Sequence, residues 1–159
     1  MAEVIIYVPC FDRSSPRHIV NYGALAVVTA LRDSDIDVLY LDGAEGSVPE
    51  VCAHLESELH NCVYLGISAF PAQVAEGLEV AAFVRSRRPE LPIVWGGIHA
   101  SLLPEETLAS AFVDYVCVGE GDYTAVELYE QLASGRPDLH QVHNLVLHED
   151  NRPVHNEIA

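Results

Sequence analysis

Short apolar segments alternate with longer amphipathic segments along most of the chain. Residues 3–8 (EVIIYV) are β-branched and apolar throughout, as expected of a strand covered on both faces. Residues 18–32 then carry apolar side chains at helical spacing. The alternation continues and predicts further strands at 36–41, 62–67, 92–95 and 115–118, with helices at 49–59, 71–87, 104–111 and 124–133.

The last part of the chain has a different pattern. Residues 144–148 and 153–156 alternate between apolar and polar positions on either side of Asp150-Asn151, which predicts a β-hairpin appended to the sheet. The five earlier strands, separated by helices, predict a doubly wound α/β fold with a parallel sheet and right-handed crossovers. The expected strand order is 2-1-3-4-5, as in flavodoxin-like folds. We therefore expect an α/β domain over residues 1–140, and the hairpin with the start of a linker toward a further domain over 141–159.

The composition excludes several classes of function. The chain has 159 residues, with 8 basic and 24 acidic side chains and a net charge of −16, and every basic residue is arginine. Without lysine there is no phosphate-loop lysine and no Schiff-base chemistry. A chain this acidic repels nucleic-acid phosphates and anionic membranes. We therefore expect neither nucleic acid nor a membrane as a partner.

Neither a membrane segment nor a cysteine-based metal site is indicated. No apolar run approaches the roughly 18–20 residues that span a bilayer, and the N-terminus lacks the pattern of a signal peptide, so we expect a cytoplasmic protein. Cys10, Cys52, Cys62 and Cys117 show no C-x-x-C spacing, which argues against a zinc or cluster site. Cys10 remains a site candidate because it lies at the carboxyl end of the first strand.

In a doubly wound sheet, ligands bind at the loops that follow the strands, here residues 9–18, 68–71, 96–101 and 119–123. A receiver domain would need acidic groups and a lysine where these loops have Pro9, Ser68 and Gly119. The phosphate loop of a flavodoxin does not match residues 9–17, which contain no glycine. The dinucleotide motif G-x-G-x-x-G is matched only partly, by residues 119–121 after the fifth strand.

Two glycine pairs end the fourth and fifth strands. Gly96-Gly97 and Gly119-Glu120-Gly121 stand where a side chain would block the approach of a ligand to the backbone. Either pair alone is also consistent with an ordinary tight turn between strand and helix. Together, on adjacent strands at one edge of the sheet, they favour a ligand segment inserted between the loops.

The same region resembles a known family. Residues 93–100 (IVWGGIHA), 103–106 (LPEE) and 114–122 (DYVCVGEGD) resemble the cobalamin-binding domain that precedes the barrel in cobalamin-dependent radical S-adenosylmethionine enzymes. The family pattern is GG-x-HA, then PEE, then D-x-V-V-x-GEGE, and Asp122 stands in place of the last glutamate. The resemblance extends over essentially the whole chain, including the YGAL that opens the first helix and the GIS that ends the third strand.

The resemblance implies a site for base-off cobalamin, in which the nucleotide tail lies between the first and third strands. Ser68 would meet the tail, and the glycine turns would let the backbone close on it. The corrin ring would lie over the carboxyl edge of the sheet. The cofactor-binding residues implied in this way are Cys10, Arg13, His18, Ser68, Phe70, Pro71, Gly96, Gly97, His99, Gly119, Glu120 and Gly121.

Two departures from related proteins limit what the chain itself does. The Asp-x-His-x-x-Gly motif, whose histidine binds cobalt in mutases, is absent after the first strand, so we expect cobalt to have no histidine ligand of that kind. The three-cysteine motif of the radical barrel is also absent. S-adenosylmethionine and an iron–sulfur cluster would therefore belong to a barrel on the same polypeptide or on a separate one.

We accordingly expect a cobalamin-binding module of a radical S-adenosylmethionine enzyme, with methyl transfer as its reaction and without catalytic residues of its own. Because the chain ends directly after the hairpin, a fragment cut before the barrel is favoured. The alternatives are a stand-alone corrinoid carrier protein and a degenerate, non-catalytic interaction domain.

Overall fold

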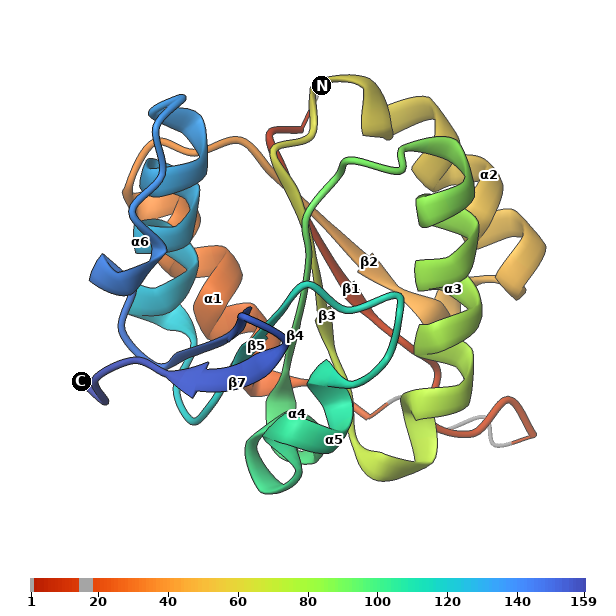
Figure 1. Ribbon diagram of the computed structural model, residues 1–159. Coiled ribbons are helices and arrows are strands. Elements are labelled where there is room, and N and C mark those ends of the chain that lie inside the picture. Colours follow the sequence, from red (N-terminus) through yellow and green to blue (C-terminus); the bar gives the residue numbers. More distant parts are fainter. Residues whose placement is uncertain (1, 15–18) are drawn as a thin grey trace.

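A twisted sheet forms the middle layer of the molecule, with helices on both of its faces (Figure 1). The computed structural model describes residues 2–14 and 19–159. In this part of the chain the sheet has seven strands in the order β2-β1-β3-β4-β5-β6-β7. They are β1 (Val4–Val8), β2 (Val38–Asp42), β3 (Tyr64–Ser68), β4 (Ile93–Gly96), β5 (Tyr115–Cys117), β6 (Leu145–Glu149) and β7 (Arg152–His155).

The long helices pair on opposite faces of the sheet. α1 (Tyr22–Asp33) packs beside α6 (Asp122–Ala133) on one face, and α2 (Val48–Glu58) packs beside α3 (Val74–Arg87) on the other (Figure 1). Two short helices, α4 (Gly97–Leu102) and α5 (Pro104–Leu108), lie between β4 and β5. Short 3-10 turns are found at Gly43–Glu45, Leu59–Asn61, Pro71–Gln73 and Leu139–Gln141.

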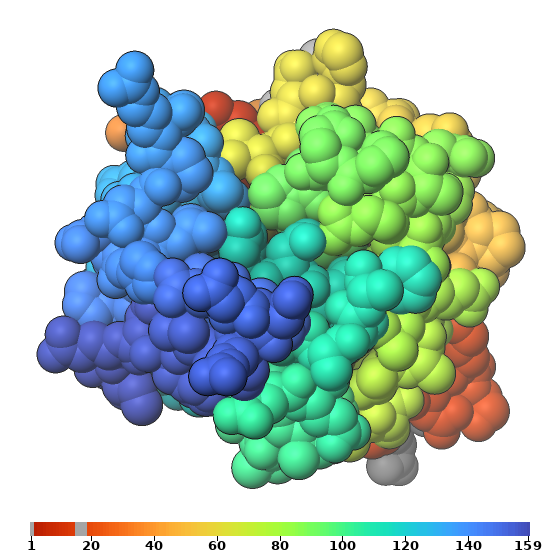
Figure 2. Space-filling model, in the orientation of Figure 1, coloured from red at the N-terminus to blue at the C-terminus, as the bar shows by residue number. Residues whose placement is uncertain are grey.

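The predicted fold is confirmed. The first five strands are parallel and have the order 2-1-3-4-5. The hairpin joins the same sheet, because β6 pairs antiparallel with β5 and β7 with β6. Asp150 and Asn151 at its turn have φ values of +48° and +61°, as a two-residue hairpin of right-handed twist requires. In the space-filling view the hairpin lies against the segment of α4 and α5 (Figure 2).

Two predicted boundaries were wrong. Residues 96–101 were expected to form a loop, but α4 (Gly97–Leu102) follows β4 directly. Its opening glycine has low helical propensity, which hides so short a helix from pattern analysis. The first helix begins at Tyr22 rather than at residue 18, because Asn21 caps it by accepting a hydrogen bond from the backbone N–H of Ala24 (2.9 Å).

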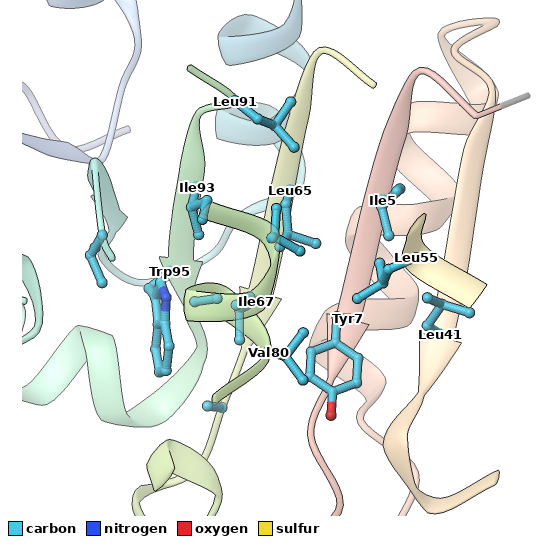
Figure 3. Close-up of a cluster of buried hydrophobic side chains, with 14 of the residues drawn as sticks. Ile5, Tyr7, Leu41, Leu55, Leu65, Ile67, Val80, Leu91, Ile93 and Trp95 are labelled. Atoms are coloured by element: carbon cyan, nitrogen blue, oxygen red, sulfur yellow. The ribbon is translucent and has the colours of Figure 1, made fainter. Parts of the chain in front are cut away.

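The face that carries α2 and α3 is densely packed. Alternate residues of the strands point toward these helices, among them Tyr7, Leu65, Ile93 and Trp95, each at most 1% exposed (Figure 3). Gly77 of α3 lies directly over the indole. A Cβ atom at this position would be 2.7 Å from Cη2 of Trp95. This layer therefore leaves no room for an added side chain.

None of the helices in residues 2–14 and 19–159 has the length and apolar character needed to cross a lipid bilayer.

The contact of Gly77 with Trp95 gives a stability prediction. We expect Gly77→Ala to lower the free energy of unfolding by about 1–2 kcal/mol, because the cost of overpacking exceeds the helical preference of alanine. Gly23→Ala in α1 is the matched control, since among the described residues its Cβ would meet Oδ1 of Asn21 alone, at 3.5 Å. That variant should be at least as stable as the wild type in urea unfolding. Equal effects of the two substitutions would refute the close packing.

Candidate functional site

A cavity of about 590 Å³ lies on the other face of the sheet, between the strands and the pair α1 and α6. Its walls come from β1, β3, β4 and β5 and from both helices. At the carboxyl edge of the sheet it reaches the surface among exposed apolar side chains, including Tyr22, Ile98 and Leu102. Its volume lies within the range of roughly 300–1,000 Å³ that is typical of ligand pockets.

The pleat of β3 explains why the cavity lies here. Tyr64, Gly66 and Ser68 alternate with Leu65 and Ile67, so the first three face α1 and α6. Gly66 leaves the middle of this row without a side chain, and a Cβ there would come within 2.7 Å of Cδ1 of Ile6. Ser68 lies at the mouth and Tyr64 at the inner end. The strand rises about 13 Å over the four residue steps between these two positions.

The inner walls of the cavity are mostly apolar. Small or branched side chains of the two helices form the wall opposite the sheet. They are Ala24 and Val27 of α1 and Ala125 and Leu128 of α6. Val94 of β4 contributes to the floor. Among the described residues that line the cavity, Glu120 is the one with a formal charge. Such a site favours an apolar ligand segment, with polar contacts confined to the mouth.

At the mouth, Asn21 and Ser68 form a polar pair. Asn21 is 9% exposed, and its Nδ2 donates a hydrogen bond to Oγ of Ser68 (3.1 Å). Ser68 thus uses its oxygen as an acceptor, and across residues 2–14 and 19–159 its hydroxyl proton meets no acceptor. The Ser68 hydroxyl is therefore available to donate a hydrogen bond to a ligand.

Other polar groups of the cavity lining are already engaged or protonated. The Tyr64 hydroxyl donates to the backbone oxygen of Ala125 (3.0 Å), and burial raises the pKa of Tyr64 well above its usual value. The Thr124 hydroxyl donates to the backbone oxygen of His143 (3.0 Å). Burial raises the pKa of the Cys117 thiol to about 11. Cys117 is therefore protonated at neutral pH in the free protein.

The glycine turns at the carboxyl edge are structurally required. Gly97 has φ +86°, and a Cβ there would lie 3.0 Å from both N and O of Ala69 and from Oγ of Ser68. Gly119 has φ +84° and donates its N–H to Oγ of Ser101 (2.9 Å). A Cβ on Gly121 would meet Cγ2 of Val27 at 3.3 Å. Side chains at these positions would crowd the mouth or strain the backbone.

The predicted site residues divide into groups. The cavity is lined by Ser68, Phe70, Gly96, Gly97, Gly119, Glu120 and Gly121. Cys10 and Arg13 line a second hollow of about 190 Å³, beyond the carboxyl ends of β1 and β2. Pro71 begins the 3-10 turn after Phe70, and His99 lies in α4, but neither lines these hollows. His18 lies outside the described residues. The binding roles of all of these residues stay predictions.

Side-chain contacts connect the loops that lie between the two hollows. The ring of Phe11 packs edge-on against Phe70, with centroids 6.2 Å apart. Gln73, which is 3% exposed, accepts a hydrogen bond from N of Phe70 (2.7 Å) and donates one to the backbone oxygen of Pro9. The loop after β1 is therefore joined to the loop after β3.

Glu76 of α3 holds Arg13 and Cys10 in the second hollow. One carboxylate oxygen of Glu76 accepts from N of Cys10 (2.8 Å), and the other accepts from Nε of Arg13 (3.0 Å). Arg13 also donates to the backbone oxygen of Gly46 (2.5 Å). In this conformation the guanidinium of Arg13 is engaged within the protein rather than directed at the cavity.

The sequence analysis missed the residues that make the inner cavity. Gly66 was noted only as part of the family resemblance, although a glycine inside an apolar strand is itself a signal of close approach. Asn21, directly before a helix, carries the signal of a cap but not of a site. Tyr64, Val94 and the helix residues have no distinguishing signal. Within the described residues, no group of three His, Cys, Asp or Glu side chains is arranged to hold a metal ion.

Comparison with known proteins agrees with this geometry. Residues 13–129 match the family model of the B12 binding domain. The radical S-adenosylmethionine methyltransferase TsrM from Kitasatospora setae, solved with cobalamin and an iron–sulfur cluster bound, matches all of this chain at 22% identity, with a TM-score of 0.78. The cobalamin-dependent S-adenosylmethionine radical enzyme OxsB, solved with aqua-cobalamin and S-adenosylmethionine bound, matches all of it at 19% identity, with a TM-score of 0.85.

These matches cover 29% of the TsrM chain and 22% of the OxsB chain, so this chain spans less than a third of either protein. At such identities the likeness establishes the fold. No curated protein sequence matches the chain.

Gly97 and Gly119 both have a left-handed backbone conformation, and together they give a matched test of the packing at the mouth. We expect Gly119→Ala to lower the free energy of unfolding by about 1–2 kcal/mol, the cost of a left-handed alanine, because its Cβ would have no contact within 4 Å among the described residues. Gly97→Ala should cost about 2–3 kcal/mol, because contacts at 3.0 Å add to the same strain. Urea unfolding measures both values. A cost for Gly97→Ala no greater than that for Gly119→Ala would contradict the crowding at Gly97.

Proposed function

The chain is a member of the B12 binding domain family, and from this premise we propose that it binds cobalamin with the nucleotide tail inserted in the cavity between the sheet and the pair α1 and α6. The observation that carries the proposal is the cavity along β3, open at Ser68 and continued inward over Gly66. A base-off cobalamin needs a slot of this kind, because its tail is a long arm that ends in a flat, methylated ring system.

The chemistry of the lining fits the parts of such an arm. The apolar inner walls would cover the ring, and burial of its surface favours binding by about 25 cal/mol per Å². The Ser68 hydroxyl would donate to a polar atom of the tail near the mouth. Gly97 has no side chain beside Ser68, where a Cβ would crowd Oγ of Ser68 at 3.0 Å. These residues bind and orient the cofactor.

The corrin ring would lie over the carboxyl edge of the sheet. Three exposed apolar side chains surround the mouth, those of Tyr22, Ile98 and Leu102. A corrin ring bound there would cover them. Phe70 lines the same mouth. The cobalt of the bound corrin supplies the reactive chemistry, while the chain supplies binding and orientation.

We further propose that the chain works as the cobalamin-binding module of a cobalamin-dependent radical S-adenosylmethionine enzyme, with methyl transfer as the reaction. TsrM and OxsB, whose folds it shares, are radical S-adenosylmethionine proteins, and TsrM is a methyltransferase. S-adenosylmethionine and the iron–sulfur cluster would bind to a barrel on the same polypeptide or on a partner protein.

Blocking the cavity tests the proposal. Ala24 of α1 is 1% exposed and lines the cavity, so the larger side chain of Ala24→Leu should occupy part of the space meant for the tail. We expect the wild-type chain to keep the visible spectrum of hydroxocobalamin after desalting, and Ala24→Leu to bind it at least about tenfold more weakly. Equilibrium dialysis measures the dissociation constants.

The control is Ala53→Leu, the same substitution on the exposed side of α2 and away from the cavity. It should bind cobalamin as the wild type does, and circular dichroism should show both variants folded. A colourless wild-type protein would refute cobalamin binding. Equal binding by Ala24→Leu and the wild type would refute the placement of the tail.

A further inference from the structure

The inner half of the cavity has almost no hydrogen-bond donors to offer. Among the described residues of this half, the Tyr64 hydroxyl is already engaged, because it donates to the backbone oxygen of Ala125. Thr124 and Cys117 lie nearer the carboxyl edge, where the Thr124 hydroxyl donates to the backbone oxygen of His143 and the Cys117 thiol is a weak donor. The remaining inner walls are apolar side chains, together with Gly66.

The free donors lie at the mouth. The hydroxyl proton of Ser68 is uncommitted among the described residues, and the amide of Asn21 has one N–H beyond the one given to Ser68. The mouth is about 13 Å from the inner end at Tyr64, by the length of β3 between them. A polar atom at the inner end of a ligand therefore finds neither a protein donor nor ready access to bulk water.

Corrinoids differ in their lower base, and this distribution of hydrogen-bond donors affects each lower base differently. Dimethylbenzimidazole presents two methyl groups and a hydrocarbon edge at the end of the tail. Adenine presents ring nitrogens at the same place, which are acceptors that need donors, and each buried acceptor without a donor weakens binding by about tenfold or more. We propose that the cavity selects corrinoids with an apolar lower base and discriminates against those with adenine, an inference that rests on the proposed cobalamin function.

Three ligands test the inference on the full chain. They are cobalamin, the corrinoid with adenine as lower base, and cobinamide, which has the corrin ring but no nucleotide tail. Equilibrium dialysis followed at the corrin absorption bands gives the dissociation constant of each. We expect cobalamin to bind at least about tenfold more tightly than the adenine corrinoid, and cobinamide to bind weakly.

The outcomes separate the inference from the function. Equal affinities for cobalamin and the adenine corrinoid, with cobinamide weaker, would overturn the selectivity and leave cobalamin binding standing. Cobinamide binding as tightly as cobalamin would overturn the placement of the tail, and with it the inference. Failure to bind any of the three would overturn the proposed function itself.

A single variant should change the selectivity. Val94 lies on β4 in the inner wall, 8% exposed, and Val94→Thr keeps its branched shape while adding a hydroxyl donor. We expect this variant to reduce the ratio of the two dissociation constants, adenine corrinoid to cobalamin, by several-fold. Val20→Thr, at the mouth where the side chain is 51% exposed, is the matched control and should leave the ratio unchanged. An unchanged ratio in Val94→Thr would contradict the donor argument.

Discussion

The absence of a side chain in the middle of β3 is the constraint on which the site depends. The two faces of the sheet use the same strands but are packed differently. Toward α2 and α3, the strands present large side chains such as Tyr7 and Trp95, and even Gly77 is in close contact. Toward α1 and α6, the row of Tyr64, Gly66 and Ser68 has no side chain at its middle position, and the cavity lies along this row, with the Ile6 side chain close to Gly66. One face therefore stabilises the fold, while the other leaves space for a ligand.

The polar groups around the cavity follow the same division. The hydroxyls of Tyr64, inside, and of Thr124, in the first turn of α6, bond to backbone oxygens and help to hold α6 and the segment before β6 in place. At the mouth, Asn21 caps α1 and also bonds to Ser68 at the end of β3. The cap thus connects the start of a wall helix to the strand beneath the cavity. The hydroxyls of Tyr64 and Thr124 thus stabilise the walls, and the Ser68 hydroxyl, which is able to meet a ligand, lies at the edge.

Much of the fold could be predicted, because it depends on local periodicity and on general rules of chain connection. The strand order, the hairpin around Asp150 and the glycine turns at Gly97 and Gly119 all follow from short sequence patterns. The mouth of the cavity was predicted for the same reason, since loops after parallel strands meet at one edge. The short helix α4 was missed because six residues carry too little periodicity.

The interior of the site could not be predicted in the same way. Val27, Val94 and Leu128 look like ordinary core residues in the sequence, and only the separation of α1 and α6 from the sheet leaves a space between them. Cys10 and Arg13 follow β1 and were expected beside the other loops. The contact of Phe11 with Phe70 and the bonds to Glu76 place them in a separate hollow, which depends on long-range contacts.

The most direct measurement is a crystal structure of the chain with methylcobalamin bound. The account predicts that the dimethylbenzimidazole lies over Gly66, between α1 and α6, within about 4 Å of Ile6, Val94 and Leu128. It would be contradicted if the base remained coordinated to cobalt or lay in solvent, with the side chains of α1 and α6 closed over β3.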